Sequence, residues 1–267
     1  LKGQPWQGVK VFGQEINALT SAIARMNLYL NGVEDFSIVR EDTLAHPAFV
    51  DGSHLRKFDI VLANPPYSIK TWDREAFMND KWGRNFLGTP PQGRADYAFF
   101  QHILSSMNEE TGRCAILFPH GVLFRKEEQE LREHLVNLDL IDCVIGIGRN
   151  LFYNSCMDAC VIICRTNKPS ERKGKIQFID AKNEVTRKNA ESYLELKHIE
   201  KITKTYFDFA EIDRFSTVVG NDIILDHNAK LSVALYVKNN NFADIEELDW
   251  KEETEELFSQ LIIDNQA

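Results

Sequence analysis

The sequence has no long uninterrupted hydrophobic run. No stretch approaches the roughly 18 consecutive apolar residues of a membrane span, and no basic segment followed by an apolar one gives the pattern of a signal peptide. We therefore expect a globular, cytoplasmic protein with no membrane partner. With 267 residues, 43% of them hydrophobic, the chain is long enough for one sizeable core and an appendage.

Closely paired cysteines are also missing. None of the five cysteines forms a Cys-x-x-Cys pair, the spacing typical of zinc and redox sites. Cys156, Cys160 and Cys164 are evenly spaced, but Val161-Ile162-Ile163 between the last two indicates a strand. We expect reduced cysteines in the core and no metal site.

Positive charge is scarce. The chain has 31 Lys and Arg against 40 Asp and Glu, which gives a net charge of −9. Because Lys and Arg supply most non-specific affinity for nucleic acid, a chain with this balance would need a local basic patch or a partner protein to bind nucleic acid. Of these two, we favour the partner protein.

The stretch around which the chain is organised is residues 58–67, Phe-Asp-Ile-Val-Leu-Ala-Asn-Pro-Pro-Tyr. It predicts a buried strand that ends in a rigid loop, because the two prolines fix φ and lack an N–H. Asn64 Oδ1 and the Pro65 carbonyl can accept both hydrogens of a planar amino group, and Tyr67 offers a face on which its ring can stack. The sequence here resembles the S-adenosylmethionine-dependent amino-group methyltransferases that carry an Asn/Asp-Pro-Pro-Tyr/Phe motif. A plain strand-to-loop turn is the alternative.

Two acidic residues follow short predicted strands. Glu15 comes after the strand at 9–13, where α/β nucleotide-binding sheets place the carboxylate that accepts the ribose hydroxyls; a carboxylate at a helix start is the alternative. Asp42 comes after the strand at 36–39 and can accept from a cofactor adenine amino group, or can cap a turn. Helical spacing predicts a helix over 18–30 between them.

A long connection, residues 68–95, follows the motif. Such a length without periodicity is typical of a lid or binding loop, and its basic and aromatic residues suit phosphates and unstacked bases. These residues are Lys70, Arg74, Lys81, Arg84 and Arg94 with Trp72, Trp82 and Phe86. An ordinary surface insertion with buried tryptophan anchors remains equally open.

Strands and helices then alternate, which predicts an α/β fold with a mostly parallel sheet. We expect a helix from Asp96, strands at 113–118, 140–147 and 159–165, and a helix at 127–138. Beyond Lys175 we expect an edge strand at 176–179, a helix at 191–202, a strand pair at 215–218 and 222–225, and an acidic amphipathic helix at 244–264 that packs on this domain or on a partner. We divide the chain into a domain of residues 1–170 and an extension of residues 171–267.

A wider set of motifs resembles the modification subunit of type I restriction-modification systems, over residues 9 to about 237. The matching segments are Gly13-Gln14-Glu15, Asn27-Leu28, Glu41-Asp42-Thr43-Leu44, Asn64-Pro65-Pro66-Tyr67, Arg94-Ala95-Asp96-Tyr97-Ala98-Phe99, Phe118-Pro119-His120-Gly121, Asn150-Leu151-Phe152, Phe178-Ile179-Asp180-Ala181 and Leu231-Ser232-Val233-Ala234-Leu235-Tyr236-Val237. The resemblance implies a Rossmann-like sheet that methylates adenine N6 in DNA with S-adenosylmethionine. It also implies partners: a specificity subunit, a second modification subunit and in some systems a restriction subunit.

The resemblance assigns roles to matching positions. Glu15 would bind the cofactor ribose and Asp42 its adenine, with Asn64 and Asp96 also at the cofactor pocket. The catalytic motif Asn64, Pro65, Pro66 and Tyr67 would hold the target N6, and Tyr67 and Phe152 would stack on the flipped base. His120 is expected to be a loop hydrogen-bonding residue without a catalytic role.

One feature of that family is missing from the sequence. The family has an earlier strand that ends in an Asp-Pro-Ala-Cys-Gly-x-Gly-Gly-Phe loop around the methionine part of the cofactor, whereas residues 1–8 hold only Gly3, Gly8 and Pro5. We expect a partial catalytic domain whose sheet has unpaired strand edges and which binds cofactor poorly alone. A non-catalytic assembly module and a protein glutamine N5-methyltransferase stay open as other functions.

Overall fold

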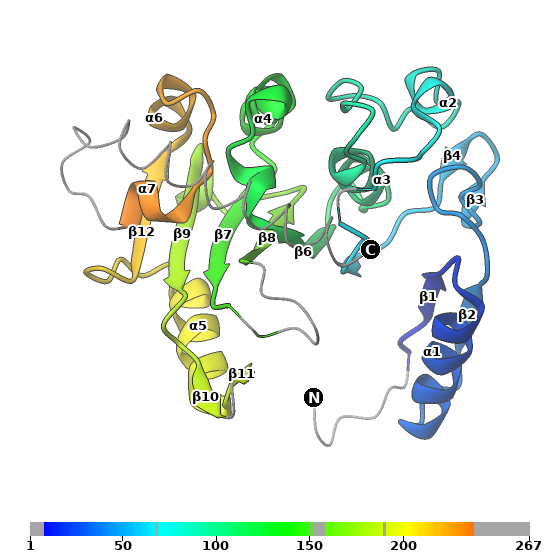
Figure 1. The fold of residues 1–267 in the computed structure, drawn as a ribbon, viewed down its shortest axis with the longest axis horizontal. Coiled ribbons are helices and arrows are strands. Elements are labelled where there is room, and N and C mark those ends of the chain that lie inside the picture. The colour runs from blue at the N-terminus through cyan, green and yellow to red at the C-terminus, as the bar shows by residue number, and fades with distance from the viewer. Residues whose placement is uncertain (1–7, 68, 150, 152–157, 189–190, 238–267) are drawn as a thin grey trace.

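The fold is built on a six-stranded sheet with the strand order β12-β9-β7-β8-β6-β5 (Figure 1). The structure, a computed structural model, describes residues 8–67, 69–149, 151, 158–188 and 191–237. The strands of this sheet are β5 (Ile60–Ala63), β6 (Arg113–Pro119), β7 (Ile141–Ile147), β8 (Ala159–Arg165), β9 (Lys175–Ala181) and β12 (Ser216–Gly220). No helix in these described ranges is long and apolar enough to cross a membrane.

The sheet is mixed, so the prediction of a mostly parallel sheet is wrong. β5 pairs with β6 and β7 with β9 in parallel, but β8 is antiparallel to both of its neighbours and β12 is antiparallel to β9. Only residues 148–158 separate β7 from β8. A parallel return needs a crossover of a dozen or more residues, usually a helix, so β8 turns back beside β7 and lies between β7 and β6.

Helices cover both faces of the sheet. On one face, α3 (Asp96–Ser105), α4 (Gln129–Asn137), α6 (Asn221–Asp226) and α7 (Val233–Val237) form the larger core with β6, β7 and β8. On the other face, α5 (Leu196–Asp208) packs against β7, β8 and β9. Side chains of β6 alternate between the two cores, as the two-residue period of a strand requires.

Four of the cysteines are buried and free, which confirms them as core residues: Cys114, Cys143, Cys160 and Cys164.

The part beyond residue 175 differs from the prediction in three ways. β9 is not an edge strand, because it lies between β7 and β12. Residues 222–225 belong to helix α6, since a short apolar run does not distinguish a strand from a buried helix turn. The predicted helix at 191–202 begins only at Leu196, where Glu195 forms a capping box with His198; residues 191–193 form β11, which pairs with β10 (Thr186–Lys188).

One sheet spans the predicted domain boundary at residue 170. β9, from the predicted extension, pairs in parallel with β7 from the predicted catalytic domain.

The acidic helix predicted at 244–264 lies outside the described residues. Shorter elements complete the description: η1 (His120–Leu123), η2 (Lys126–Glu128), η3 (Ser170–Arg172), α2 (Arg74–Met78) and the hairpin β3 (Val50–Asp51) with β4 (His54–Leu55).

A second, two-stranded sheet lies apart from the first. β1 (Val11–Gln14) pairs in parallel with β2 (Phe36–Val39), and α1 (Ala18–Leu30) connects them. In the described ranges β1 pairs only with β2 and β5 only with β6, so both have an open edge, as expected from the resemblance. On β5, Ile60 and Leu62 are accordingly 61% and 77% exposed, so the prediction of a buried strand at this position is wrong.

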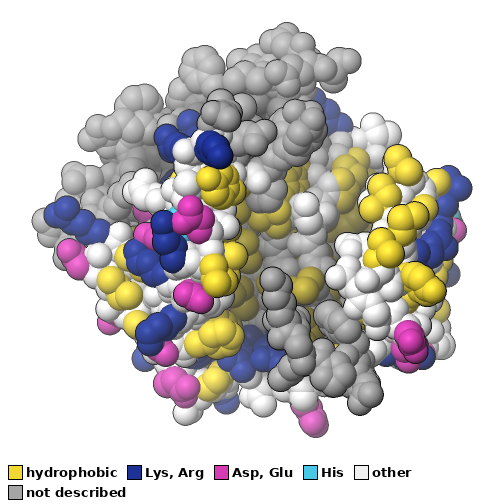
Figure 2. Space-filling view, turned by 90° about the horizontal axis from the view of Figure 1, so that it is seen from below, with side chains coloured by type: hydrophobic (Ala, Val, Ile, Leu, Met, Phe, Trp, Pro, Cys, Tyr) yellow, Lys and Arg dark blue, Asp and Glu magenta, His cyan; other side chains and the backbone are white. Residues whose placement is uncertain are grey.

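The apolar stripe of α1 faces solvent. Its predicted helical spacing is confirmed, and Asn17 caps the helix by accepting from the Leu19 and Thr20 amides. Yet few of the described residues pack against this stripe. Each of its members is more than half exposed: Leu19, Ile23, Met26 and Leu30. Figure 2 shows hydrophobic side chains gathered at the side of the molecule where α1 lies. Rings join this unit to the main sheet: the Phe12 and Phe58 centroids are 5.4 Å apart, and Phe49 packs edge-on against both.

Candidate functional site

The Asn64-Pro65-Pro66-Tyr67 loop begins where β5 ends. Ala63 is the last residue of β5 and pairs with Ile116 of β6. The prolines have no N–H to continue the ladder, so the strand stops there. Pro65 is buried and anchors the loop, whereas Asn64 and Pro66 are exposed and Tyr67 is half-buried. The Asn64 amide is therefore held on a rigid backbone and accessible to an incoming amino group.

Tyr67 lies beside the first turn of α3. Burial, followed by the nearby Cys160 and Asp96, raises the pKa of Tyr67 to about 12. The phenol therefore stays protonated at neutral pH, which suits a neutral ring for stacking. Tyr67 and Asp96 are close enough to interact electrostatically, so the structure brings together two of the predicted site positions.

Asp96 is fully buried and ion-paired. The Arg125 guanidinium donates from Nη1 to Asp96 Oδ2 at 3.0 Å, and both residues are at most 5% exposed. This contact turns the Asp96 carboxylate toward the protein interior. The role of Asp96 in cofactor binding stays a prediction, with Arg125 as its observed partner.

Glu128 completes a buried cluster that the sequence did not indicate. Its Oε2 lies 3.6 Å from Arg125 Nη1, and neither carboxylate oxygen accepts a hydrogen bond from the described residues. Burial, opposed by the charge of Arg125, raises the pKa of Glu128 to about 7. In the sequence, Arg125 to Glu128 form a charged run typical of a solvated surface, so no local signal marked this cluster.

Glu128 should make the stability of the fold depend on pH. Its folded-state pKa of about 7 lies above its ordinary value of 4.5, so the folded chain binds this proton more tightly than the unfolded chain does. Its stabilising effect is complete below about pH 4.5 and is lost as the pH rises to about 7, a change of about 3 kcal/mol. Because Glu128→Gln cannot ionise, we expect its free energy of unfolding, relative to wild type, to rise by about this amount over that range.

Urea denaturation at pH 5, 6, 7 and 8 measures this difference. The exposed neighbour Glu127 provides the control, and Glu127→Gln should follow the wild-type pH profile. Parallel profiles for Glu128→Gln and wild type would contradict the prediction.

Glu15 and Asp42 lie at the same end of the small sheet. Glu15 follows β1, and its amide donates to Val39 O at the end of β2. Asp42 lies three residues after Val39. Glu15 Oε1 accepts from Asn17 N at 2.7 Å, and Asp42 Oδ1 accepts from the Leu44 and Ala45 amides at 2.8 and 3.0 Å. Both carboxylates thus perform the capping roles that the sequence left open.

The same pair can also accept from a ligand. Each is half-buried and uses only one carboxylate oxygen within the described part of the chain. The other oxygens fit ribose hydroxyls and an adenine amino group, the donors that S-adenosylmethionine presents. Among the described residues no hydrogen bond or ion pair joins Glu15 or Asp42 to Asn64, and Phe152 lies outside the described residues.

The segment after the motif folds upon itself. Trp72 Nε1 donates to Gln92 O at 2.7 Å, and Arg74 Nε donates to Pro90 O at 2.8 Å. Arg84 is only 1% exposed, so the prediction that it meets phosphates is wrong. Lys70 and Lys81 are exposed and remain candidates for that contact.

Comparison with known proteins identifies the family of this chain. The family profile described as "N-6 DNA Methylase" matches residues 2–245. The "Type I restriction enzyme MpnII methylase subunit" of Mycoplasma pneumoniae is 34% identical over 253 residues, which cover 91% of this chain and 46% of that protein. The "Type I restriction enzyme MjaVIII methylase subunit" of Methanocaldococcus jannaschii is 34% identical over 264 residues, 93% of this chain and 44% of that protein.

A solved structure gives the same result. The crystal structure of the type I restriction-modification system methyltransferase subunit from Streptococcus thermophilus is 34% identical and superposes with a TM-score of 0.80, over 87% of this chain and 49% of that one. The chain thus spans about half the length of the relatives it matches. The resemblance and the Rossmann-like fold class expected from the sequence are confirmed. The chain belongs to the N-6 DNA methylase family.

Proposed function

We propose that this chain forms the target-binding part of a DNA adenine-N6 methyltransferase, the modification subunit of a type I restriction-modification system. The observation that carries the proposal is the loop after β5: exposed Asn64 on a proline-fixed backbone, followed by Tyr67 beside Asp96. The curated relatives named above are themselves type I methylase subunits. S-adenosylmethionine, when bound, would supply the methyl group.

The loop can activate an adenine amino group. Extruding the base from the duplex costs a few kcal/mol, offset by stacking on Tyr67 and by hydrogen bonds to the base edge. Asn64 Oδ1 and the Pro65 carbonyl would accept the two N6 hydrogens and stabilise the positive charge that develops on the nitrogen. No side chain with a pKa near neutrality has to remove the proton, because the methylated amine releases it readily to water.

Glu15 and Asp42 would hold the donor. Glu15 would accept from the ribose hydroxyls and Asp42 from the adenine amino group. The net charge of −9 favours a specificity subunit as the component that grips the DNA, with a second modification subunit and a restriction subunit as further partners. Because its proposed substrate is DNA, we expect the protein in the cytoplasm.

Methyl transfer by the assembled complex tests the proposal. The complex is incubated with labelled S-adenosylmethionine and DNA, and the labelled product is identified by mass spectrometry. N6-methyladenine supports the proposal, whereas label on glutamine side chains of a protein, or no transfer, would overturn it. Calorimetric titration of the chain alone with S-adenosylmethionine then measures how much of the cofactor site it carries.

Tyr67 should matter for its ring and not for its hydroxyl. Because stacking of one base on an aromatic side chain is worth about 1–3 kcal/mol, we expect Tyr67→Ala to weaken binding of DNA with an extruded target base about 10-fold to 100-fold. Tyr67→Phe keeps the ring and should bind within about threefold of wild type. Fluorescence of 2-aminopurine at the target position measures both; equal losses for the two variants would exclude stacking as the role.

A further inference from the structure

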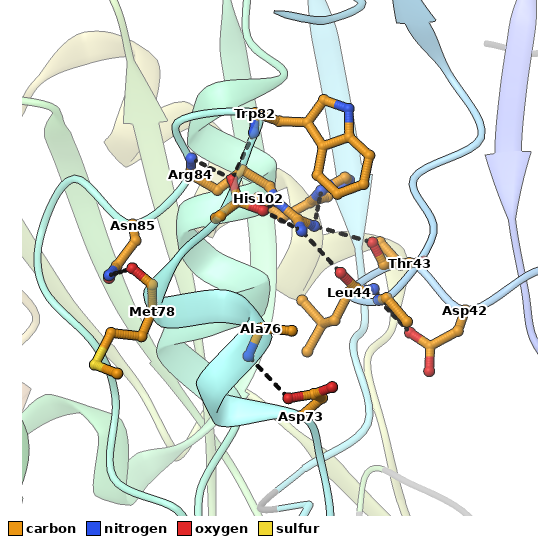
Figure 3. Close-up of polar contacts among 12 residues, drawn as sticks. Asp42, Thr43, Leu44, Asp73, Ala76, Met78, Trp82, Arg84, Asn85 and His102 are labelled. Atoms are coloured by element: carbon orange, nitrogen blue, oxygen red, sulfur yellow. Dashed lines mark hydrogen bonds and ion pairs between the residues drawn. The ribbon is translucent and has the colours of Figure 1, made fainter. Parts of the chain in front are cut away.

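Arg84 has one of the largest fully buried side chains among the described residues. A guanidinium carries five N–H donors, and all five have partners (Figure 3). Nε and Nη2 donate to Asp80 Oδ1 at 2.9 and 2.6 Å. Nη1 and Nη2 donate to the Thr43 and Leu44 carbonyls at 3.1 and 2.8 Å, and Nη1 lies 3.3 Å from His102 Nδ1.

The histidine partner is an acceptor. Burial, followed by the charge of Arg84, lowers the pKa of His102 to about 3. The ring is therefore neutral at physiological pH, and its Nδ1 can accept from the guanidinium while Nε2 carries the proton. His102 lies on α3, the helix that begins at Asp96 beside Tyr67.

Asp80 holds the guanidinium from the other side. Burial acts to raise the pKa of Asp80, but its hydrogen bonds and ion pair with Arg84 hold it below the ordinary value. Asp80 Oδ2 also accepts from the Trp82 and Arg84 amides at 3.1 and 2.8 Å. A buried ion pair contributes little stability by itself. Because three separate segments of the chain supply the acceptors of the Arg84 guanidinium, these hydrogen bonds indicate a constraint on the relative position of the three segments.

The constrained segment is the turn that carries Asp42. Thr43 and Leu44, whose carbonyls accept from Arg84, follow Asp42 directly. The Leu44 and Ala45 amides in turn donate to Asp42 Oδ1. Arg84 therefore holds the carbonyls of this turn against α3. The Asp42 carboxylate closes the same turn by accepting from its amides.

We propose that Arg84 is a positioning residue that couples the cofactor side of the site to the target side. It holds the turn of Asp42, the acceptor for the cofactor adenine, at a fixed place relative to the helix next to Tyr67. This inference rests on the proposed function of Asp42 and Tyr67. Loss of the guanidinium fork would free the Asp42 turn and weaken cofactor binding, and through it the binding of a flipped base, because coupling between two sites is reciprocal.

The test compares Arg84→Met with Arg74→Met in the same segment. Arg74 is half-buried and donates from Nε to Pro90 O, without contact to the Asp42 turn. Two quantities are measured on the full chain and its complex: hydrogen exchange of the Leu44 and Ala45 amides, and the Kd for S-adenosylmethionine. We expect Arg84→Met to speed exchange at these amides and to raise the Kd, each about 10-fold or more, and Arg74→Met to change neither by more than about twofold.

Arg84→Lys separates charge from geometry. Lysine keeps the charge but has three donors on a single nitrogen, so it should raise the Kd nearly as much as methionine does; full rescue by lysine would overturn the assignment. If Arg84→Met does not fold, Asp80→Asn, which keeps an acceptor oxygen, should shift exchange and Kd in the same direction by less. A folded Arg84→Met with wild-type exchange and Kd would also overturn it. Because exchange needs no cofactor, failure of wild type to bind S-adenosylmethionine would count against the proposed function alone.

Discussion

Asn64→Ala should abolish methyl transfer and leave the fold intact. Asn64 is exposed and lies in the loop after β5, so its truncation creates no cavity and should change the free energy of unfolding by no more than about 0.5 kcal/mol. In the proposed mechanism, the same change removes one of the two acceptors that stabilise charge on the target nitrogen. Removal of a single preorganised group of this kind lowers kcat by about 10²–10³, and loss of base orientation adds to it.

The measurement is single-turnover methyl transfer by the complete complex, with urea denaturation of each variant alongside. Asn137→Ala, at the exposed end of α4, is the matched control and should keep both full activity and full stability. Methyl transfer by Asn64→Ala within about tenfold of wild type would contradict the role assigned to this side chain. Unfolding of the variant would contradict the assignment of Asn64 to an exposed loop.

Arg125→Met should destabilise the fold strongly. Arg125 lies between Asp96 and Glu128, which are both 0% exposed, and its Nη1 is 3.0 and 3.6 Å from their carboxylates. Without the guanidinium these two carboxylates lose the cation between them in a buried site. Removing one partner from a buried ion pair costs about 3–5 kcal/mol, because a buried charge loses its nearest opposite charge.

Denaturation midpoints at two pH values distinguish this cause from a simple packing defect. The loss in free energy of unfolding should be smaller at pH 5 than at pH 8, because protonation of Glu128 at the lower pH removes one of the two buried negative charges. The double variant with Glu128→Gln should recover part of the loss for the same reason. Lys126→Met, at the exposed neighbouring position, should be neutral within about 0.5 kcal/mol. A loss below about 1 kcal/mol, independent of pH, would exclude the charge explanation.

Much of the fold follows from local sequence patterns. The period of apolar residues predicted α1, and the apolar runs predicted β5, β6, β7 and β8, because side-chain period depends only on neighbours along the chain. The end of β5 was equally predictable, since Pro65 and Pro66 cannot donate to a ladder. The open edges of β1 and β5 were predicted from the resemblance and not from any local pattern.

Other features depend on contacts between distant residues. Nothing local in β8 specifies that it lies between β6 and β7, because strand order depends on the connection and on which edge is available. Likewise, nothing next to Arg84 or Arg125 in the sequence indicates their partners, yet both are buried. Their burial depends on acceptors far along the chain, the Thr43 and Leu44 carbonyls for Arg84 and Asp96 for Arg125. Local sequence patterns thus predicted most of the helices and strands, and the Asn-Pro-Pro-Tyr loop that we propose binds an amino group. Which charges lie beside that loop became visible only in the fold, because a side chain's partner is set by packing and not by its sequence neighbours.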